Sequence, residues 1–227
     1  MPPAAPDHRI AIVPVTQFQQ NCSIVWQPAT MRGAVIDPGG EPGLIVQTLS
    51  RLGVSAEAIL LTHGHLDHAG GALALKYLLD QAHHERGEPP VPVIGPDERD
   101  RFLLDGIEEQ QKLFNMGGLR NITPDRWLVE GDVVDVAGLH FDVYHVPGHS
   151  PGSVVFVEAA RRFAFVGDVL FRNGIGRHDF PYGNGDQLVA GIKTKLLPLG
   201  DDIAFVCGHG PSSTFGAERL GNIFVKD

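Results

Sequence analysis

The sequence predicts a single domain of mixed α/β structure, layered as helix, sheet, sheet and helix. Three observations predict it. The first third holds short apolar strands that lead into a strand, a tight turn and a helix. From residue 126 onward, strand-like segments alternate with turns and lead to another helix and strand. No linker-like break separates the halves, so residues 1–227 are expected to form one unit with helices outside two sheets.

Composition sets the outer limits. The chain has 227 residues, of which 43% are hydrophobic and 20% charged, enough for one good core. No run reaches the roughly 20 apolar residues of a membrane-spanning helix, and residues 1–9 do not begin a signal peptide. The formal charge of −9 argues against nucleic acid or an anionic membrane as a partner. We expect a cytoplasmic protein that acts on a small molecule, in an oligomeric state that the sequence leaves open.

The two cysteines fit a reducing compartment. Cys22 and Cys207 lie far apart in the sequence, each within an apolar run, and two cysteines make no disulfide framework. We expect both to be buried, unreactive thiols.

In the first half, short apolar runs predict strands and longer amphipathic runs predict helices. Strands are expected at 10–15, 22–26, 33–37, 58–62 and 91–94, and helices at 43–52, 72–79 and 96–114. The segment 83–90 is polar and ends in two prolines, so it is expected to be an exposed loop in which His83 and His84 are solvated.

In the second half, alternating hydrophobic residues between turn signals predict a second sheet. Its strands are expected at 127–129, 133–136, 139–146, 153–157, 163–166 and 203–207, with a helix at 187–197 before the last of them.

The turn after strand 58–62 carries the densest group of metal-binding residue types in the chain. In an extended segment, residues two apart point the same way, so His63 and His65 can meet at one point. Asp67 and His68, at the entry to the next helix, face a neighbouring point. The alternative is that these histidines are solvated side chains of a loop. Their position between a buried strand and a helix disfavours it. Imidazole and carboxylate without thiolate favour zinc, with iron or manganese as alternatives.

Three later strand ends repeat this chemistry. His149, Asp168 and His209 each follow a glycine, which lets the backbone turn sharply near a crowded centre. If Asp168 bridges, two divalent ions are predicted, one held by His63, His65, His149 and Asp168, the other by Asp67, His68, His209 and Asp168. Structural zinc sites are usually closed and rich in cysteine, so an open pair is expected to be catalytic. Two ions about 3.5–4 Å apart lower the pKa of a bridging water and generate hydroxide.

These motifs resemble the metallo-β-lactamase superfamily. The resemblance rests on the run THGHLDH at 62–68 and on the later Gly-His, Gly-Asp and Gly-His pairs in the same order. Within the superfamily, the segments at 18–22, 35–40, 174–181 and 207–214 are similar to short, single-domain glyoxalase II-like hydrolases.

The resemblance implies an αββα fold, two metal ions and hydrolysis of a thioester such as S-lactoylglutathione by a metal-bridging hydroxide. Asp67 and Asp168 would be the catalytic residues, with Asp67 orienting the nucleophile. Asp37 matches a position that supports the metal loop, with an ordinary turn aspartate as the alternative. Arg177 matches a basic residue that meets the substrate, with a solvated loop arginine as the alternative.

Other readings stay open. A persulfide dioxygenase of the same fold shares the loop at 176–180 and uses one iron, but the complete set Asp67, His68 and His209 favours the hydrolase. A metal-binding module without turnover is a third reading, disfavoured because every ligand position holds a competent residue. The best-known β-lactamases of the superfamily carry cysteine at the second metal, where this chain has aspartate, which disfavours antibiotic hydrolysis.

Overall fold

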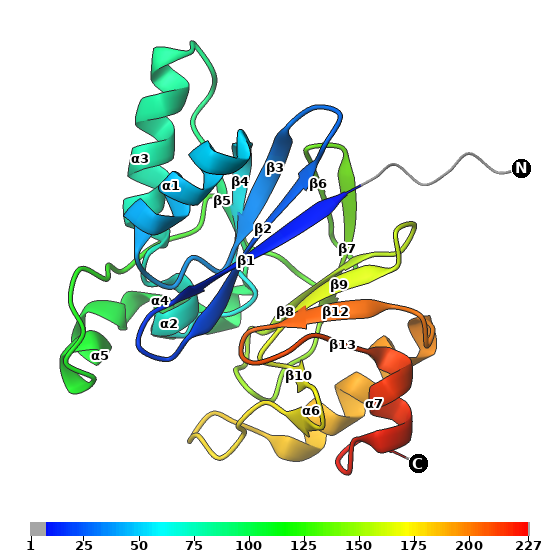
Figure 1. Cartoon of the computed structure of the whole chain (residues 1–227). Coiled ribbons are helices and arrows are strands. Elements are labelled where there is room, and N and C mark those ends of the chain that lie inside the picture. The colour runs from blue at the N-terminus through cyan, green and yellow to red at the C-terminus, as the bar shows by residue number, and fades with distance from the viewer. Residues whose placement is uncertain (1–7, 227) are drawn as a thin grey trace, which may run out of the picture.

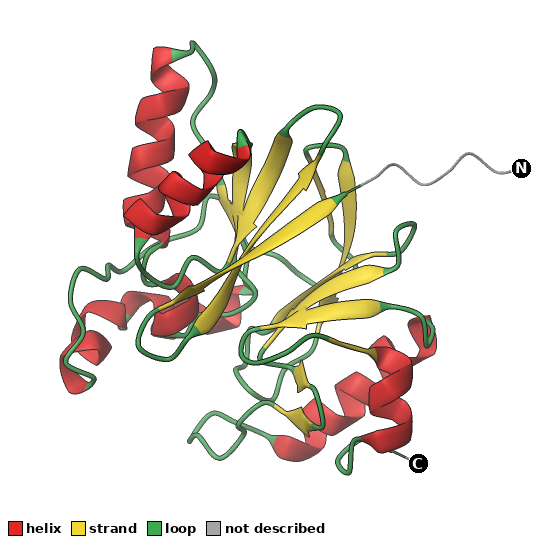
Figure 2. Cartoon of the chain, in the orientation of Figure 1, coloured by secondary structure: helices red, strands yellow, loops and turns green. Residues whose placement is uncertain are grey.

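Two β-sheets lie face to face, and helices cover the outer face of each (Figures 1 and 2). The structure, a computed structural model, describes residues 8–226. The expectation about a leader at residues 1–9 therefore falls almost wholly outside the described residues. Within them, no helix combines the length and the apolar character needed to cross a bilayer.

The first sheet places two loops at one edge. Its strands, in spatial order, are β1 (Arg9–Val15), β2 (Gln20–Gln27), β3 (Arg32–Ile36), β4 (Ser55–Leu60) and β5 (Val93–Ile94). The pairs from β3 to β5 are parallel, so each needs a crossover, and α1 (Pro42–Leu52) and α3 (Ala72–Glu85) supply them. The loops that follow β3 and β4 consequently leave the sheet at the same edge.

The second sheet repeats the arrangement. Its spatial order is β13 (Ser213–Thr214), β12 (Ala204–Cys207), β9 (Phe163–Gly167), β8 (Val154–Glu158), β7 (Leu139–His145) and β6 (Val133–Val136). The pair β9 and β12 is parallel, so the residues after both strands emerge side by side. A small hairpin, β10 (Leu170–Phe171) and β11 (Gly174–Ile175), follows β9. The outer helices are α6 (Gly185–Gly191) and α7 (Phe215–Gly221). α6 continues without a break into a π-helical turn, η2 (Ile192–Leu196), and a 3-10 turn, η3 (Leu197–Leu199), so the predicted helix at 187–197 is helical throughout.

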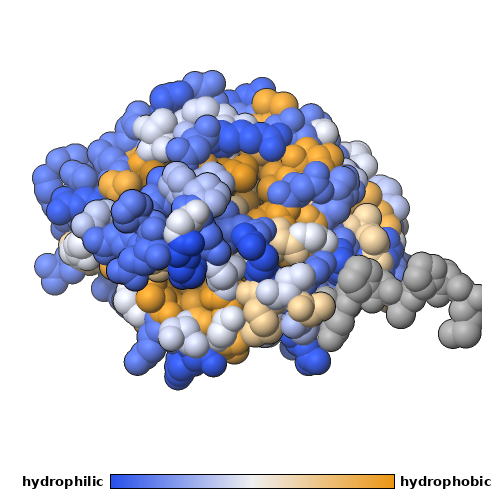
Figure 3. All heavy atoms as spheres, turned by 90° about the horizontal axis from the view of Figure 1, so that it is seen from above, coloured by the Kyte–Doolittle hydropathy of each residue, from blue (hydrophilic) through white to orange (hydrophobic). Residues whose placement is uncertain are grey.

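Three hydrophobic cores correspond to the three contacts between the four layers. The first joins α1 and α3 to the first sheet, the second fills the space between the sheets, and the third joins α6 and α7 to the second sheet. Side chains that represent them are Ile45 and Leu75 in the first, Leu60 and Phe156 in the second, and Leu188 and Phe215 in the third. The predicted αββα layering is confirmed. Seen from above, hydrophilic residues cover most of the face in view, and hydrophobic residues show in patches between them (Figure 3).

Two predicted elements were wrong. Residues 127–129 form no strand; Leu128 N donates to Pro96 O and Val129 N to the Asp132 side chain, so no ladder continues there. The single helix predicted at 96–114 is three short helices, η1 (Glu98–Asp100), α4 (Arg101–Asp105) and α5 (Ile107–Leu113), interrupted at Gly106.

The predicted loop at 83–90 was also wrong at its start. α3 runs on to Glu85, because its buried stripe Leu75, Leu79 and His83 continues at a spacing of four residues. His83 is buried rather than solvated, and its Nδ1 lies 2.8 Å from the Pro89 carbonyl oxygen. The sequence prediction also missed α7, whose two glycines weaken the helical signal; Thr214 caps it by accepting from Ala217 N.

Both cysteines are buried and free, as predicted. Burial raises the pKa of the Cys207 thiol to about 11 and raises that of Cys22 well above its ordinary value. Neither thiol is therefore a ready nucleophile at neutral pH.

Candidate metal centre

The structure brings all seven predicted ligand residues together at one edge of the sandwich. Four of them follow β4, where the chain turns through α2 (Leu66–Ala69) into α3. His149 lies in the turn between β7 and β8, Asp168 directly follows β9, and His209 follows β12. Side chains from both sheets therefore converge on a centre that neither sheet could build alone.

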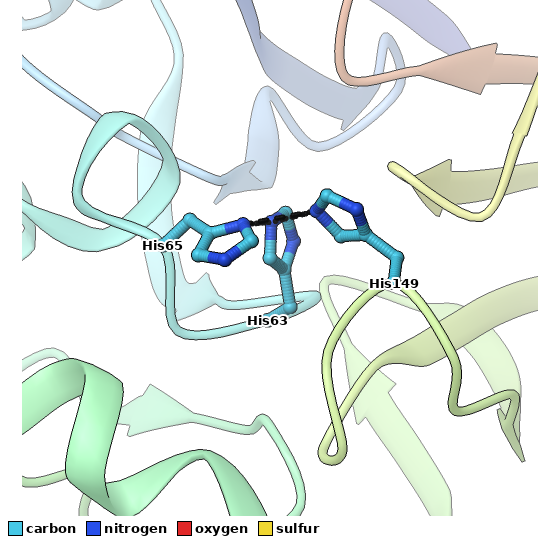
Figure 4. A group of neighbouring side chains, drawn as sticks. All are labelled: His63, His65 and His149. Carbon is cyan, nitrogen blue, oxygen red and sulfur yellow. Dashed lines mark hydrogen bonds between the residues drawn. The ribbon is translucent and has the colours of Figure 1, made fainter. Parts of the chain in front are cut away.

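Three histidines form the first ligand group: His63, His65 and His149. Their rings turn toward one point between two loops (Figure 4). His63 Nε2 lies 3.0 Å from His65 Nδ1 and 3.3 Å from His149 Nε2, and the last two nitrogens are 2.9 Å apart. Four-coordinate zinc with Zn–N bonds of about 2.0–2.1 Å places its ligand nitrogens about 3.3 Å apart. The triangle therefore has the size of a metal-binding face.

The opposite nitrogen of each ring faces an oxygen. These oxygens are the Thr62 hydroxyl, 3.1 Å from His63 Nδ1, the Tyr182 hydroxyl, 2.9 Å from His65 Nε2, and the Arg177 carbonyl, 2.7 Å from His149 Nδ1. A ring N–H that donates outward leaves the inward nitrogen with its lone pair, which is the form that binds a cation.

Electrostatics favour the same state. Burial lowers the pKa of His63 and His149, and burial followed by the proximity of His149 lowers the pKa of His65 to about 3. All three rings are therefore neutral at pH 7, with three lone pairs directed at one point.

The second ligand group is Asp67, His68 and His209. Asp67 Oδ2 lies 3.2 Å from His209 Nε2 and 4.0 Å from His68 Nε2. The outward nitrogens again face oxygens: His68 Nδ1 lies 2.9 Å from Asp37 Oδ2, and His209 Nδ1 lies 3.2 Å from the Phe18 carbonyl. Both histidines of this group present Nε2 inward, as His63 and His149 do in the first group.

Asp168 lies between the two groups. Its Oδ2 is 3.6 Å from His149 Nε2 and 3.7 Å from His209 Nε2, and its Oδ1 is 3.4 Å from His68 Nε2. Burial alone would raise the pKa of Asp168, but His68 and the other histidines outweigh it and hold that pKa well below the usual range. Asp168 is thus a carboxylate with one oxygen near both groups.

Two buried atoms of this cluster indicate that it suits a cation. His68 Nε2 and Asp168 Oδ1 are both buried and have no hydrogen-bond partner among residues 8–226. Buried polar atoms are nearly always paired, because an unpaired one loses its hydration without compensation. A divalent ion between them would satisfy both, and the donor set of imidazoles and carboxylates suits zinc, iron or manganese.

Asp37 contacts the ligand groups through His68 and Thr62. Its Oδ1 accepts from Thr62 N at 2.7 Å, while its Oδ2 accepts from the Thr62 hydroxyl at 2.6 Å and from His68 Nδ1 at 2.9 Å. One carboxylate thus orients His68 directly, and His63 through the Thr62 hydroxyl. This geometry favours the supporting position over an ordinary turn aspartate.

Sequence reasoning missed Asp100 and Tyr182. Asp100 is fully buried and accepts from Gly64 N at 2.8 Å, the Ser150 hydroxyl at 2.7 Å and Gly152 N at 2.6 Å. It therefore links the loop of His63 and His65 to the loop of His149. In the sequence it reads as one more acidic residue at a helix start, since its partners lie 36 to 52 positions away.

A cavity of about 410 Å³ opens over the centre. It is lined by Phe18, His65, Leu66, Asp67, Gln110, Phe114, His149, Asp168, Arg177, Phe180, Tyr182 and His209. Arg177 lines this cavity, and its guanidinium pairs with Asp179 and lies 4.4 Å from the centre of the Phe180 ring. A small molecule in this cavity would reach both ligand groups.

Metal binding at the second ligand group is expected to release a proton. Burial alone would lower the pKa of His68, but Asp168 and Asp67 raise it well above its ordinary value, so the metal-free protein holds that proton at pH 7. A cation at Nε2 displaces it, so apparent zinc affinity there should rise about tenfold per pH unit until the pH passes this pKa. Calorimetric zinc titration in buffers of different protonation enthalpy measures the release; equal heats in every buffer would contradict it.

Comparisons with known proteins identify the family. The family model described as the metallo-beta-lactamase superfamily matches residues 15–209. The hydroxyacylglutathione hydrolase GloC of Haemophilus influenzae is 43% identical over 96% of this chain and 98% of its own length.

Solved structures give the same assignment. The structure described as BLEG-1 B3 metallo-beta-lactamase has a TM-score of 0.82 and is 30% identical, covering 96% of this chain and 100% of that one. The structure of TTHA1623 in a di-iron-bound form has a TM-score of 0.81 and is 33% identical, covering 94% of this chain and 99% of that one. With its fold, its His and Asp ligand groups and these relatives in agreement, the chain belongs to the metallo-β-lactamase superfamily.

Proposed function

We propose that the protein is a binuclear metal-dependent hydrolase that cleaves thioesters of the S-lactoylglutathione type. The observation that carries the proposal is the position of Asp168, whose oxygens lie within 3.7 Å of histidine nitrogens from both ligand groups. The 43% identity to a hydroxyacylglutathione hydrolase supports the substrate class. The two buried free thiols support the cytoplasm as its compartment.

In this proposal, each ligand group holds one ion and Asp168 is shared. The first ion would be held by His63, His65, His149 and Asp168, and the second by Asp67, His68, His209 and Asp168. Zinc is the expected metal, and the relative solved in a di-iron form makes iron the first alternative, ahead of manganese.

The ions, when bound, would activate the hydrolytic water and stabilise the negative charge that develops on the acyl oxygen. The protein's own residues do the rest. Asp67 lines the cavity. Burial alone would raise the pKa of Asp67, but His68 and His209 outweigh burial and lower that pKa. Asp67 is therefore a carboxylate that can orient the attacking water. Water adds to the acyl carbon, the carbon–sulfur bond breaks, and the thiolate takes a proton.

Tyr182 is a candidate donor to the substrate. Its oxygen lies 2.9 Å from His65 Nε2 and can accept that N–H, which leaves its own proton free. Burial raises the pKa of Tyr182 to about 12, so the hydroxyl is protonated at pH 7. Since Tyr182 also lines the cavity, its O–H can donate a hydrogen bond to a substrate oxygen or to the departing sulfur.

One experiment separates the candidate functions. Elemental analysis of the purified protein is combined with three assays: hydrolysis of S-lactoylglutathione, oxygen uptake with glutathione persulfide, and cleavage of a chromogenic cephalosporin. Close to two ions per chain with thioester cleavage is the expected result. One iron per chain with oxygen uptake and no hydrolysis would move the function to the dioxygenase, cephalosporin cleavage alone to a β-lactamase, and bound metal without any reaction to a metal-binding module.

A further inference from the structure

The cavity over the centre has an aromatic mouth, formed by Phe18, Phe114, Phe180 and Tyr182. The rings form two pairs. Phe18 and Phe114 make an edge-to-face contact with centroids 5.5 Å apart, and Phe180 and Tyr182 stack at 5.3 Å. Such pairs are favourable arrangements, so the mouth is an ordered surface.

Each pair is fixed to one ligand group. The carbonyl of Phe18 lies 3.2 Å from His209 Nδ1, and the hydroxyl of Tyr182 lies 2.9 Å from His65 Nε2. Gln17 Nε2 donates to the Phe114 carbonyl at 3.1 Å, which ties the end of α5 to the turn between β1 and β2. One aromatic pair therefore lies beside each ligand group.

These rings expose apolar surface that the fold alone does not require. Phe18 and Phe114 are 37% and 43% exposed. Contiguous exposed apolar surface in a concave site typically marks a ligand groove, because covering it removes that surface from water. A lactoyl group offers one methyl and one hydroxyl to these rings, whereas an alkyl or aryl acyl group would cover them.

The charges of the cavity favour the same kind of ligand. Among the described residues that line it, Arg177 is the one lysine or arginine. Its guanidinium already pairs with Asp179 and packs on Phe180. A substrate at this mouth would therefore be bound mainly through contact with apolar side chains, and less through pairing with a cationic side chain.

We propose that the aromatic mouth takes the acyl group, and that thioesters with apolar acyl groups are the preferred substrate class. This inference rests on the proposed thioester hydrolysis and adds the identity of the acyl group. The step itself is unchanged: a carbon–oxygen bond forms, the carbon–sulfur bond breaks, and a carboxylate and a thiol leave.

The test uses two series on the metal-loaded protein. Binding of S-methyl-, S-propyl- and S-hexylglutathione, thioethers that cannot be hydrolysed, is measured by calorimetry. Hydrolysis is measured with acetyl, butyryl and hexanoyl thioesters of glutathione. In each series we expect Kd to fall, or kcat/KM to rise, by about threefold per added methylene.

The variants Phe18→Ala and Phe114→Ala should reduce that dependence to below about 1.5-fold per methylene, while the S-methyl compound binds within about threefold of wild type. Tyr77→Ala is the control, since Tyr77 is a 62% exposed aromatic on α3 outside the cavity. A merely destabilised variant would weaken every ligand alike and keep the dependence on chain length.

The outcomes separate the two proposals. Hydrolysis with no dependence on chain length in wild type, or with the same dependence in Phe114→Ala, overturns the aromatic mouth and leaves the thioester hydrolase intact. A dependence in thioether binding that Phe114→Ala removes, without hydrolysis of any thioester, overturns the hydrolase and supports the mouth as an apolar binding site.

Discussion

Replacing Asp168 by alanine is expected to lower thioester hydrolysis on the order of 10³-fold and to reduce the bound metal to one ion per chain or fewer. The reason is position: one Asp168 oxygen lies 3.6 Å from His149 and 3.7 Å from His209, and the other 3.4 Å from His68. Without it, neither ligand group keeps a full set, and the two ions lose their common carboxylate. Elemental analysis and steady-state kinetics on the same preparation measure both effects.

The matched control is Asp186→Asn, which changes an exposed carboxylate in the first turn of α6. It should retain metal and activity within about twofold. Circular dichroism on Asp168→Ala distinguishes loss of the site from loss of the fold. If the folded variant kept two ions and hydrolysed thioesters within threefold of wild type, Asp168 would not be the bridge and the binuclear mechanism would fail.

The strongest sequence predictions are those in which chemistry and spacing lie within one short segment. His63, His65 and His68 could be identified because a strand, a turn and a helix follow in order, and each imposes its own side-chain period. His149, Asp168 and His209 needed a further step. Each is weak alone, and their prediction rested on the glycine that precedes the polar residue at all three strand ends. The parallel pairing of β9 and β12, which brings Asp168 and His209 side by side, is seen in the structure alone.

What the sequence could not supply is contact between distant segments. The aromatic mouth joins Phe18 to Phe114, 96 positions away. Phe18 begins a segment that resembles the glyoxalase II-like hydrolases, but nothing in that segment indicates a contact with Phe114. The burial of His83 was likewise not predicted from its local sequence. Its polar neighbours predicted a loop, but its spacing from Leu75 and Leu79 places it on the buried face of α3, and tertiary burial prevailed over local polarity.

Among the residues that are not predicted metal ligands, Asp100 is the one whose loss should cost most. Asp100→Ala is expected to weaken metal binding at the first ligand group by about 10–100-fold, in line with other residues that hold metal ligands in place. Its carboxylate accepts from Gly64 N, between His63 and His65, and from the Ser150 hydroxyl, next to His149. Removing it frees both loops, and the three inward nitrogens lose their fixed spacing.

The same substitution should destabilise the fold by about 3 kcal/mol, because the amides of Gly64 and Gly152 and the Ser150 hydroxyl would lose their buried acceptor. Burial raises the pKa of Asp100 to about 6, and donated hydrogen bonds, led by that of the Ser150 hydroxyl, counteract part of that rise. Urea denaturation of the metal-free protein measures the stability loss separately from any effect on metal.

Cobalt titration followed by visible absorption tests the positioning role, because the band reports the geometry around the ion and not the stability of the fold. Asp97→Asn is the matched control: Asp97 is also buried, three residues earlier, but within residues 8–226 its side chain accepts hydrogen bonds from Arg99 alone, in its own turn. Ser150→Ala, which removes one donor and leaves the carboxylate in place, should weaken the first ion by less than tenfold.

A positioning role for Asp100 predicts a specific asymmetry. The first ion should be weakened and its cobalt spectrum altered, while the second ion, held by Asp67, His68 and His209, binds within about threefold of wild type. The reason is that Asp100 contacts the two loops of the first ligand group, whereas the contact that orients His68 comes from Asp37. Equal weakening of both ions with an unchanged cobalt band would show that Asp100 supports the fold alone.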